Sequence, residues 1–296
     1  MTGARYLPDL IPPNAGRWQV REVPVTYLRQ LMAIFILAMA LPAIVLPVGP
    51  ALAGVSRCLA IANAAPQVQF AALLPAALTQ GEVRLTYVGH STFLIESAEG
   101  VRIATDFTGF AGTGVVPDVV TMNHAHTSHF TEMPDPRIRH VLRGWNPAGG
   151  PARHDLTVGD VMIRNVPTDI RNFAGLREAD GNSIFIFEAG GLCIGHLGHL
   201  HHELEPQDLG VIGQLDVVLV PVDGGYTMAQ ASMINVIKLL KARLIIPMHY
   251  FGSATLATFL DGMRDDFEVE ISVSPVVVVS ALTLPKSPKV LVLPGY

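Results

Sequence analysis

Three apolar segments of the chain lead into histidines, and this feature constrains the fold more than any other. The segments are 118–122, 192–197 and 244–248. Continuous apolar runs of this length are typical of strands covered on both faces. Histidines at the strand ends or just beyond are His124, His126, His129, His196, His199, His201, His202 and His249. Because neighbouring strand ends share one edge of a sheet, we expect these side chains to gather there.

The composition describes a folded chain without a nucleic-acid surface. Of the 296 residues 50% are apolar and 15% are charged, which excludes a disordered protein. The net charge is −5 and no block of Lys or Arg occurs, so we expect no nucleic-acid partner. The two cysteines are too few for a disulfide framework or a cysteine-based zinc site, and we interpret Cys193 as a small core residue.

The distribution of strands and helices predicts a layered α/β body. The expected strands are 83–88, 92–96, 101–105, 118–122, 158–166, 183–188, 192–197, 217–222, 244–248, 268–274 and 276–281. The expected helices are 205–212, 228–241 and 256–265. The early strands form a meander and the later ones alternate with helices. This order predicts two packed sheets with helices outside, a four-layer arrangement in one domain over 82–296.

The N-terminal region has the features of an export signal. Residues 31–48 are apolar but broken by prolines, and four arginines precede them. The small residues Ala51-Leu52-Ala53 fit a cleavage site, and Asn63-Ala64-Ala65 is a second candidate. We therefore expect an extension with signal peptide over 1–53, an Ala-rich linker over 54–81, and a periplasmic or secreted protein. An uncleaved membrane anchor at 31–48 and a buried core helix are the alternatives.

The histidine loop after the fourth predicted strand is suited to metal binding. His124, His126 and His129 follow one another at spacings of two and three residues. Imidazoles in such a loop can converge on a borderline-soft cation such as Zn²⁺. The alternative is a polar loop that is rich in histidine by chance.

Several motifs together resemble the metallo-β-lactamase superfamily. They are YVGHSTFLIES at 87–97, NHAHTSHF at 123–130, LCIGHLGHLHHEL at 192–204, LDVVLVPVDGGYTM at 215–228 and ARLIIPMHY at 242–250. Within the superfamily the chain looks like the branch of ascorbate-6-phosphate lactonase and N-acylphosphatidylethanolamine-hydrolysing phospholipase D. The resemblance implies an αββα sandwich with a hydrolytic site for two metals at one edge. It puts His124, His126, His129 and His249 at ligand positions.

The chain departs from the family pattern at three of the positions that hold the metals. Ser128 replaces an aspartate, Thr168 stands where a histidine is expected, and His199 replaces the aspartate that bridges both metals. An imidazole offers one lone pair and cannot bridge two cations. We therefore expect one ion, zinc with manganese or iron as alternatives. The expected ligands are His124, His126, His129, His199 and His249.

Asp223 is the candidate catalytic residue outside the histidine groups. It stands in the sequence PVDGGYT, where the family resemblance leads one to expect glycine. Its carboxylate is suited to binding the metal, orienting a histidine or acting as a general base, and the alternative is a turn formed with Gly224 and Gly225. Other candidates near the site are His90, Ser128, His196 and His202. For His196, a buried histidine whose hydrogen bonds are satisfied within the core is an equally good interpretation. For His90, a histidine that is hydrogen-bonded in a turn is equally good.

These observations predict a metal-dependent hydrolase. A metal-activated water would attack an ester, lactone or phosphodiester, and the substrate would be a small or lipid-like molecule. A non-catalytic metal- or ligand-binding protein on the same fold is the alternative. A membrane partner is expected only if the N-terminal segment stays uncleaved.

Overall fold

The structure is a computed structural model that describes residues 56, 58–59, 77–124, 127–171 and 175–295. The predicted signal region and most of the predicted linker lie outside these residues, as does His126. Contacts divide the chain into Met1–Leu52 and Ala53–Tyr296, and the account below concerns the second unit. None of the helices in the described ranges is both long and apolar enough to cross a membrane.

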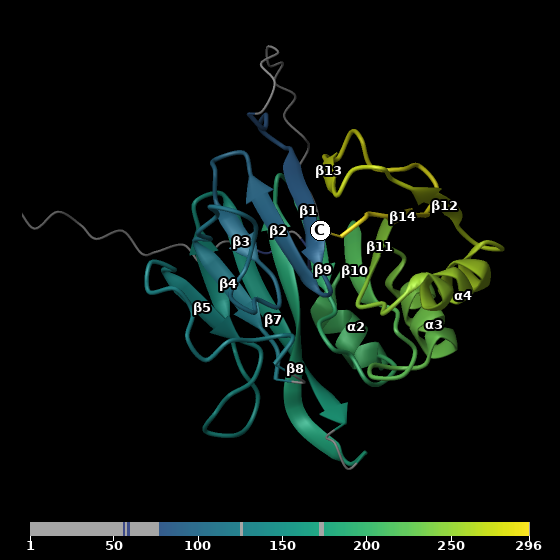
Figure 1. The fold of residues 1–296 in the computed structure, drawn as a ribbon, viewed down its shortest axis with the longest axis horizontal. Helices are drawn as coiled ribbons and strands as arrows, with labels where there is room; N and C mark the ends of the chain where they lie inside the picture. Colours follow the sequence, from purple (N-terminus) through teal and green to yellow (C-terminus); the bar gives the residue numbers. More distant parts are fainter. Residues whose placement is uncertain (1–55, 57, 60–76, 125–126, 172–174, 296) are drawn as a thin grey trace, which may run out of the picture. The chain divides into compact units, whose positions relative to one another are not determined.

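The first sheet has six strands and begins as a meander (Figure 1). In spatial order the strands are β13 (Val276–Val279), β1 (Val83–Gly89), β2 (Thr92–Ser97), β3 (Arg102–Ala104), β4 (Val119–Met122) and β5 (His140–Arg143). The pairs from β13 to β3 are antiparallel, whereas β3, β4 and β5 run parallel. The carboxyl end of β4 therefore opens into the loop that carries His129.

The second sheet has eight strands. In spatial order they are β12 (Glu268–Ile271), β14 (Lys289–Val292), β11 (Leu244–Met248), β10 (Val217–Pro221), β9 (Leu192–His196), β8 (Arg177–Ala189), β7 (Val161–Arg171) and β6 (Asp155–Val158). Strands β12 to β9 are parallel, and β8, β7 and β6 continue antiparallel. The loops that carry His199, Asp223 and His249 follow β9, β10 and β11, so they share one edge of this sheet.

Apolar residues cover both faces of the second sheet. Its inner face packs against the first sheet through residues such as Phe93, Phe185 and Leu219. Its outer face packs against α2 (Pro206–Ile212), α3 (Gln230–Leu240) and α4 (Ser253–Met263), which lie together on that side in Figure 1. The helix α3 contributes Met233, Val236, Ile237 and Leu240, the side predicted from its helical spacing.

The expected α/β sandwich of the metallo-β-lactamase type is confirmed, with one difference in the described part of the chain. There the outer face of the first sheet is covered by loop residues rather than by a helix. Phe107, Ala111 and Ile138 pack on Val120 and Met122 to form a small separate core. The short strands β5, β6 and β14 were not predicted, because four residues give too little periodicity to recognise.

Cys193 is a buried core residue as predicted, but it is also paired in a disulfide that the sequence analysis did not predict. Cys193 lies in β9 and forms a disulfide with Cys58, 135 residues earlier in the chain. Both cysteines are buried in the core below α2, and the Gln214 amide donates to the Cys58 carbonyl at 2.9 Å. The bond ties residue 58 to the second sheet.

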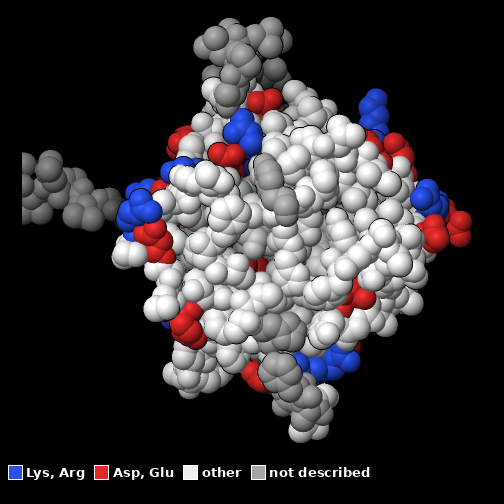
Figure 2. Space-filling view, viewed as in Figure 1, with Lys and Arg blue, Asp and Glu red and all other residues white. Residues whose placement is uncertain are grey.

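Charged side chains are few on the face shown in Figure 2. Most of those visible lie near the rim of the view, and lysine or arginine alternates there with aspartate or glutamate. This face shows no extended surface of one sign.

Candidate metal centre

Three histidines from separate loops converge at the edge between the two sheets. They are His90 in the turn between β1 and β2, His129 after β4, and His249 after β11. One ring nitrogen from each lies within 4.8 Å of the others. His129 and His249 are fully buried and His90 is half-buried. This group could hold a metal ion.

Two buried carboxylates orient His129 and His249. Nδ1 of His129 lies 2.7 Å from Oδ2 of Asp106, and Nδ1 of His249 lies 3.0 Å from Oδ1 of Asp223. A carboxylate only accepts hydrogen bonds, so each Nδ1 carries the proton. In the neutral imidazole each Nε2 then presents a lone pair.

These two lone pairs face each other, since the Nε2 atoms of His129 and His249 are 3.0 Å apart. Two bare acceptors at this distance repel unless a cation lies between or beside them. Two imidazoles bound to one tetrahedral zinc ion have nitrogen atoms about 3.3 Å apart, because each Zn–N bond is about 2.0–2.1 Å. The donor set therefore fits a single borderline-soft cation.

The same carboxylates stay ionised despite their burial. Burial disfavours the charged form of Asp106, but its electrostatic interactions with the His196 and His129 rings and hydrogen bonds from His129 and Asn123 hold its pKa below the usual value. Burial also opposes ionisation of Asp223, but hydrogen bonds from His249, Thr227 and the Gly225 amide lower its pKa strongly. Both groups thus place negative charge behind the imidazoles, which favours a bound cation.

Backbone strain is concentrated at this site. His90, Asp106 and His249 have φ angles of 52°, 41° and 57°, in the left-handed region that side chains other than glycine rarely adopt. The His90 carbonyl, held in this turn, accepts hydrogen bonds from the His249 amide at 2.7 Å and the Tyr87 hydroxyl at 2.9 Å. Such strain persists where the surrounding contacts fix the conformation, and it commonly marks functional sites.

His199 lies beside the three histidines. It is fully buried, and its ring centre is 4.7 Å from that of His129 and 4.9 Å from that of His249, nearly perpendicular to both. The preceding Gly198 has a φ of 60°, and a Cβ atom there would lie 2.4 Å from the side chains of Asn123 and Asn182. The chain therefore needs glycine at this turn to bring His199 to the site.

Other predicted residues are placed elsewhere. The ring of His124 stacks on Trp145 at 5.0 Å, and its Nδ1 lies 3.4 Å from Glu178. Nε2 of His202 accepts from the Asp169 amide of β7 at 3.2 Å, and its Nδ1 donates to the Glu203 carbonyl at 2.8 Å. Ser128 is half-buried in the turn before His129. His126 lies outside the described residues.

His196 is a buried structural histidine, one of its two predicted interpretations. Its Nε2 donates to the Ser91 carbonyl at 2.8 Å, and its Nδ1 accepts from the Gly198 amide at 3.1 Å. Burial lowers the pKa of its ring, which keeps it neutral. Both ring nitrogens are thus engaged by the backbone.

Thr168, at the position of the missing family histidine, lies in β7. It is buried, and its hydroxyl accepts from the Asn182 side chain at 2.7 Å. Thr168 and Asn182 are both uncharged. The position at which the family resemblance predicts a histidine ligand therefore provides only a hydroxyl, which is already hydrogen-bonded.

Aromatic side chains border the histidine group on the solvent side. Phe251 is 62% exposed, and its ring centre lies 5.6 Å from that of His90 and 5.4 Å from that of His249. Tyr226, also 62% exposed, packs against Phe251 with ring centres 5.3 Å apart. These two rings offer apolar surface next to the site.

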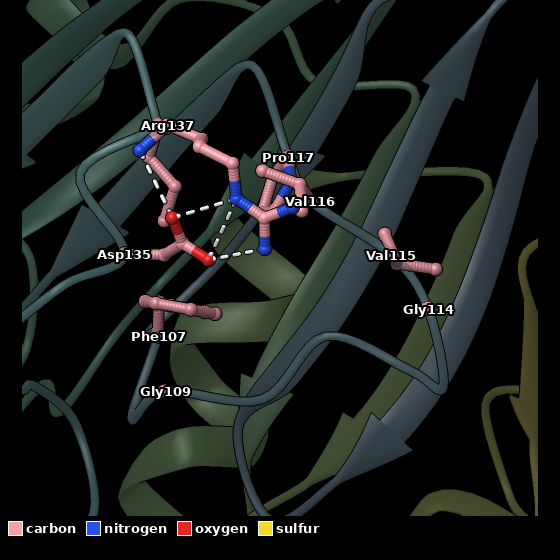
Figure 3. A pocket seen from close by; sticks show the side chains of 9 residues that line it. Phe107, Gly109, Gly114, Val115, Val116, Pro117, Asp135 and Arg137 are labelled. Atoms are coloured by element: carbon pink, nitrogen blue, oxygen red, sulfur yellow. Dashed lines mark hydrogen bonds and ion pairs between the residues drawn. The ribbon is translucent and has the colours of Figure 1, made fainter.

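Two cavities lie outside the histidine group. The larger, about 620 Å³, is lined by residues of β7 and of the 201–208 segment, including Thr168, Arg171 and His201. The smaller, about 260 Å³, lies at the loop core on the first sheet, where Arg137 binds Asp135 (Figure 3). Only the larger one reaches a residue that contacts His199.

The sequence identifies His90 and Asp223 as candidates but does not predict which groups they contact. His90 was only a candidate, because a Gly-His-Ser-Thr turn gives no indication of which strand end it faces. Asp223 was predicted from its departure from the family pattern, and its contact with His249 depends on β10 and β11 being neighbours.

Comparison with known proteins places this site in a family. Residues 84–249 match the model of the β-lactamase superfamily domain, which is more than half of the chain. A crystal structure from Thermotoga maritima, assigned as a Zn-dependent hydrolase of the metallo-β-lactamase superfamily, shares 31% identity with a TM-score of 0.51. It covers 71% of this chain and 98% of its own.

Curated relatives agree. A UPF0173 metal-dependent hydrolase of Archaeoglobus fulgidus is 28% identical over 199 residues, which is 57% of this chain and 83% of the relative. A protein of the same description from Opitutus terrae is 29% identical over 192 residues, 57% of this chain and 85% of its own.

The fold and the histidine group define a metallo-β-lactamase-type protein with three histidines that could hold a metal ion. The chain belongs to the metallo-β-lactamase superfamily, and it is similar to the UPF0173 metal-dependent hydrolases within it. The expected class of enzyme, a metal-dependent hydrolase, is the class to which these relatives are assigned. The narrower lactonase and phospholipase branch stays a prediction.

Proposed function

We propose that the protein is a hydrolase that works with one divalent cation, zinc in the first place and manganese or iron as alternatives. His90, His129 and His249 would hold it. The observation that carries this proposal is the 3.0 Å approach of two Nε2 lone pairs whose tautomers are set by Asp106 and Asp223. Such an arrangement is unfavourable without a positive charge.

A cation bound there lowers the pKa of a water molecule and polarises a carbonyl or phosphoryl oxygen. The chain contributes the orientation of its ligands. Asp223 accepts hydrogen bonds from the Gly225 amide at 2.8 Å and the Thr227 hydroxyl at 2.5 Å in addition to His249. Since its oxygens are thus engaged, we assign Asp223 to positioning His249 rather than to proton abstraction.

The substrate in this proposal is an ester, lactone or phosphodiester with an apolar group. The exposed rings of Phe251 and Tyr226 support this choice, because they lie beside His90 and His249 and offer surface to an acyl or aryl chain. A small or lipid-like substrate satisfies both parts of the site.

The test is metal content combined with turnover. The purified chain is stripped with a chelator, reloaded with zinc, and assayed against aryl esters, lactones and phosphodiesters. We expect one tightly bound equivalent and turnover that returns with the metal. Bound zinc without turnover on any of these substrates would favour the alternative, a non-catalytic metal-binding protein, and two tight equivalents would contradict the single-ion site.

The apolar part is tested separately with Phe251→Ala. We expect the advantage of long-chain over short-chain esters in kcat/KM to fall by about tenfold, because an exposed ring covers about two methylene groups. Phe110→Ala is the matched control, since Phe110 is 52% exposed but lies in the loop on the first sheet. Equal chain-length preference in both variants would remove the apolar group from the proposal.

An exported location is part of the same proposal. The Cys58–Cys193 disulfide supports it, because such bonds persist in oxidising compartments and are rare in the cytosol. Peptide mapping without reduction, on protein from the periplasm of a Gram-negative host, should recover the two cysteine peptides linked. Free thiols in that material would remove the disulfide as support for export, absence of the chain from the periplasmic fraction would contradict export, and a retained 31–48 segment would identify the anchored form.

A further inference from the structure

Among the residues that the structure describes, His199 is the one fully buried histidine beside the candidate metal site whose ring hydrogen-bonds a histidine outside the group of three. Its Nδ1 hydrogen-bonds Nε2 of His201, which is half-buried at the wall of the larger cavity. The direction of this hydrogen bond decides what His199 presents to the site. A neutral imidazole carries one proton, so whichever nitrogen accepts leaves the other as the donor.

Arg171 determines the direction. Its backbone amide lies 2.9 Å from Nδ1 of His201 and its Nε lies 3.1 Å from the same atom. Both groups are obligatory donors, since the guanidinium does not lose its proton. Nδ1 of His201 is therefore an acceptor, and the proton of that ring is on Nε2.

The chain of hydrogen bonds then runs one way. Nε2–H of His201 donates to Nδ1 of His199, so His199 carries its own proton on Nε2. An imidazole nitrogen that bears a proton cannot bind a metal. The tautomer is opposite to that of His129 and His249, whose Nδ1 atoms carry the protons and whose Nε2 atoms are bare.

We infer that His199 is a hydrogen-bond donor to the substrate oxygen at this site, and that His201 and Arg171 are positioning residues that hold it in the donating tautomer. The inference rests on the proposed function for its substrate but not for its tautomer. It replaces the expectation that His199 binds the metal. An N–H beside the cation would stabilise negative charge that develops on a carbonyl or phosphoryl oxygen.

Arg171 also connects this chain to the other side of the site. Its guanidinium donates to the Thr227 carbonyl, and Thr227 donates through its hydroxyl to Asp223, the partner of His249. One arginine at the end of β7 thus holds both the donor histidine and the loop that orients a ligand.

The tautomers can be read directly by long-range ¹H–¹⁵N spectroscopy of histidine-labelled protein, with and without zinc. The His199 signals are assigned by their loss in His199→Gln. In the wild type we expect a protonated Nε2 and an unprotonated Nδ1 in both states. A protonated Nδ1, or an Nε2 that binds zinc, would overturn the inference.

Two variants of His201 test the positioning role. His201→Gln keeps an acceptor for Arg171 and a donor for His199, so we expect the wild-type tautomer. His201→Glu offers only acceptors, so His199 should move its proton to Nδ1 and its freed Nε2 should bind zinc, with affinity raised about tenfold. The added negative charge of His201→Glu could by itself raise the zinc affinity. Scalar coupling between His199 Nε2 and bound ¹¹³Cd, seen in His201→Glu and absent in the wild type, would show that His199 binds the metal directly.

If His201→Glu leaves the His199 tautomer unchanged, His201 does not set it and the inference fails. The proposed function is judged by other data, because the metal-free spectra report the tautomer even if the wild type binds no zinc. Conversely, a wild type that binds one zinc with His199 as a ligand would keep the hydrolase and remove only the donor.

Discussion

The two halves of the expected metal site differ in what lies behind the histidines. In the half formed by His129 and His249, each imidazole is fully buried and backed by an ionised carboxylate. In the half expected around His124, the ring is 44% exposed and stacks on Trp145, while Thr168 contributes only a hydroxyl. The difference teaches that a histidine becomes a fixed ligand through the group that holds its second nitrogen, not through its place in a motif.

The comparison predicts that ligand loss will be very unequal between the halves. His249→Ala should weaken zinc binding by more than about 100-fold, because it removes a donor from a set of three. His124→Ala should change it by less than about threefold. Competition with a chromophoric chelator measures both, and comparable losses in the two variants would show that His124 does bind the metal.

The next effect concerns the carboxylates behind the rings. Asp223→Asn should reduce zinc affinity by about 10–100-fold. The amide oxygen is a weaker acceptor than a carboxylate oxygen, and the amide nitrogen places a donor against groups that are themselves donors. Glu178→Gln is the matched control, since Glu178 is the acidic partner of the exposed His124. Isothermal titration of the two variants decides whether the backing carboxylate is what separates the halves.

The smallest expected effect is a second, weakly bound zinc ion after the family residues are restored around His124. Ser128→Asp together with Thr168→His and His199→Asp restores the acidic and imidazole groups that the resemblance associates with a second ion. We expect a second, weakly held equivalent of zinc in elemental analysis, and none when Thr168→His is left out. A second equivalent with Ser128→Asp alone would mean that charge, not ligand number, limits the site.

The fold was predictable because its signals are local. The apolar runs at β4, β10 and β11 and the helical spacing in α3 each lie within a dozen residues, and the residues after those strands include His129, Asp223 and His249. The strand ends therefore predict the positions of these three residues from the sequence alone.

The remaining features depend on pairs far apart in the chain. Nothing near Cys58 indicates Cys193, and nothing near Arg171 indicates a donor to His201 thirty residues later. The motif predicts His124 as a ligand, but its side chain stacks on Trp145 and pairs with Glu178, which belong to other segments. Tautomers are also outside sequence reasoning, because they are set by the neighbour of each nitrogen.

The disulfide makes the two candidate processing points unequal. Cleavage after Ala53 would leave Cys58 on the mature chain. Cleavage after Ala65 would remove Cys58 and leave Cys193 as a buried, unpaired thiol in β9. A peptidase that acts at the first point delivers a chain that can still be oxidised.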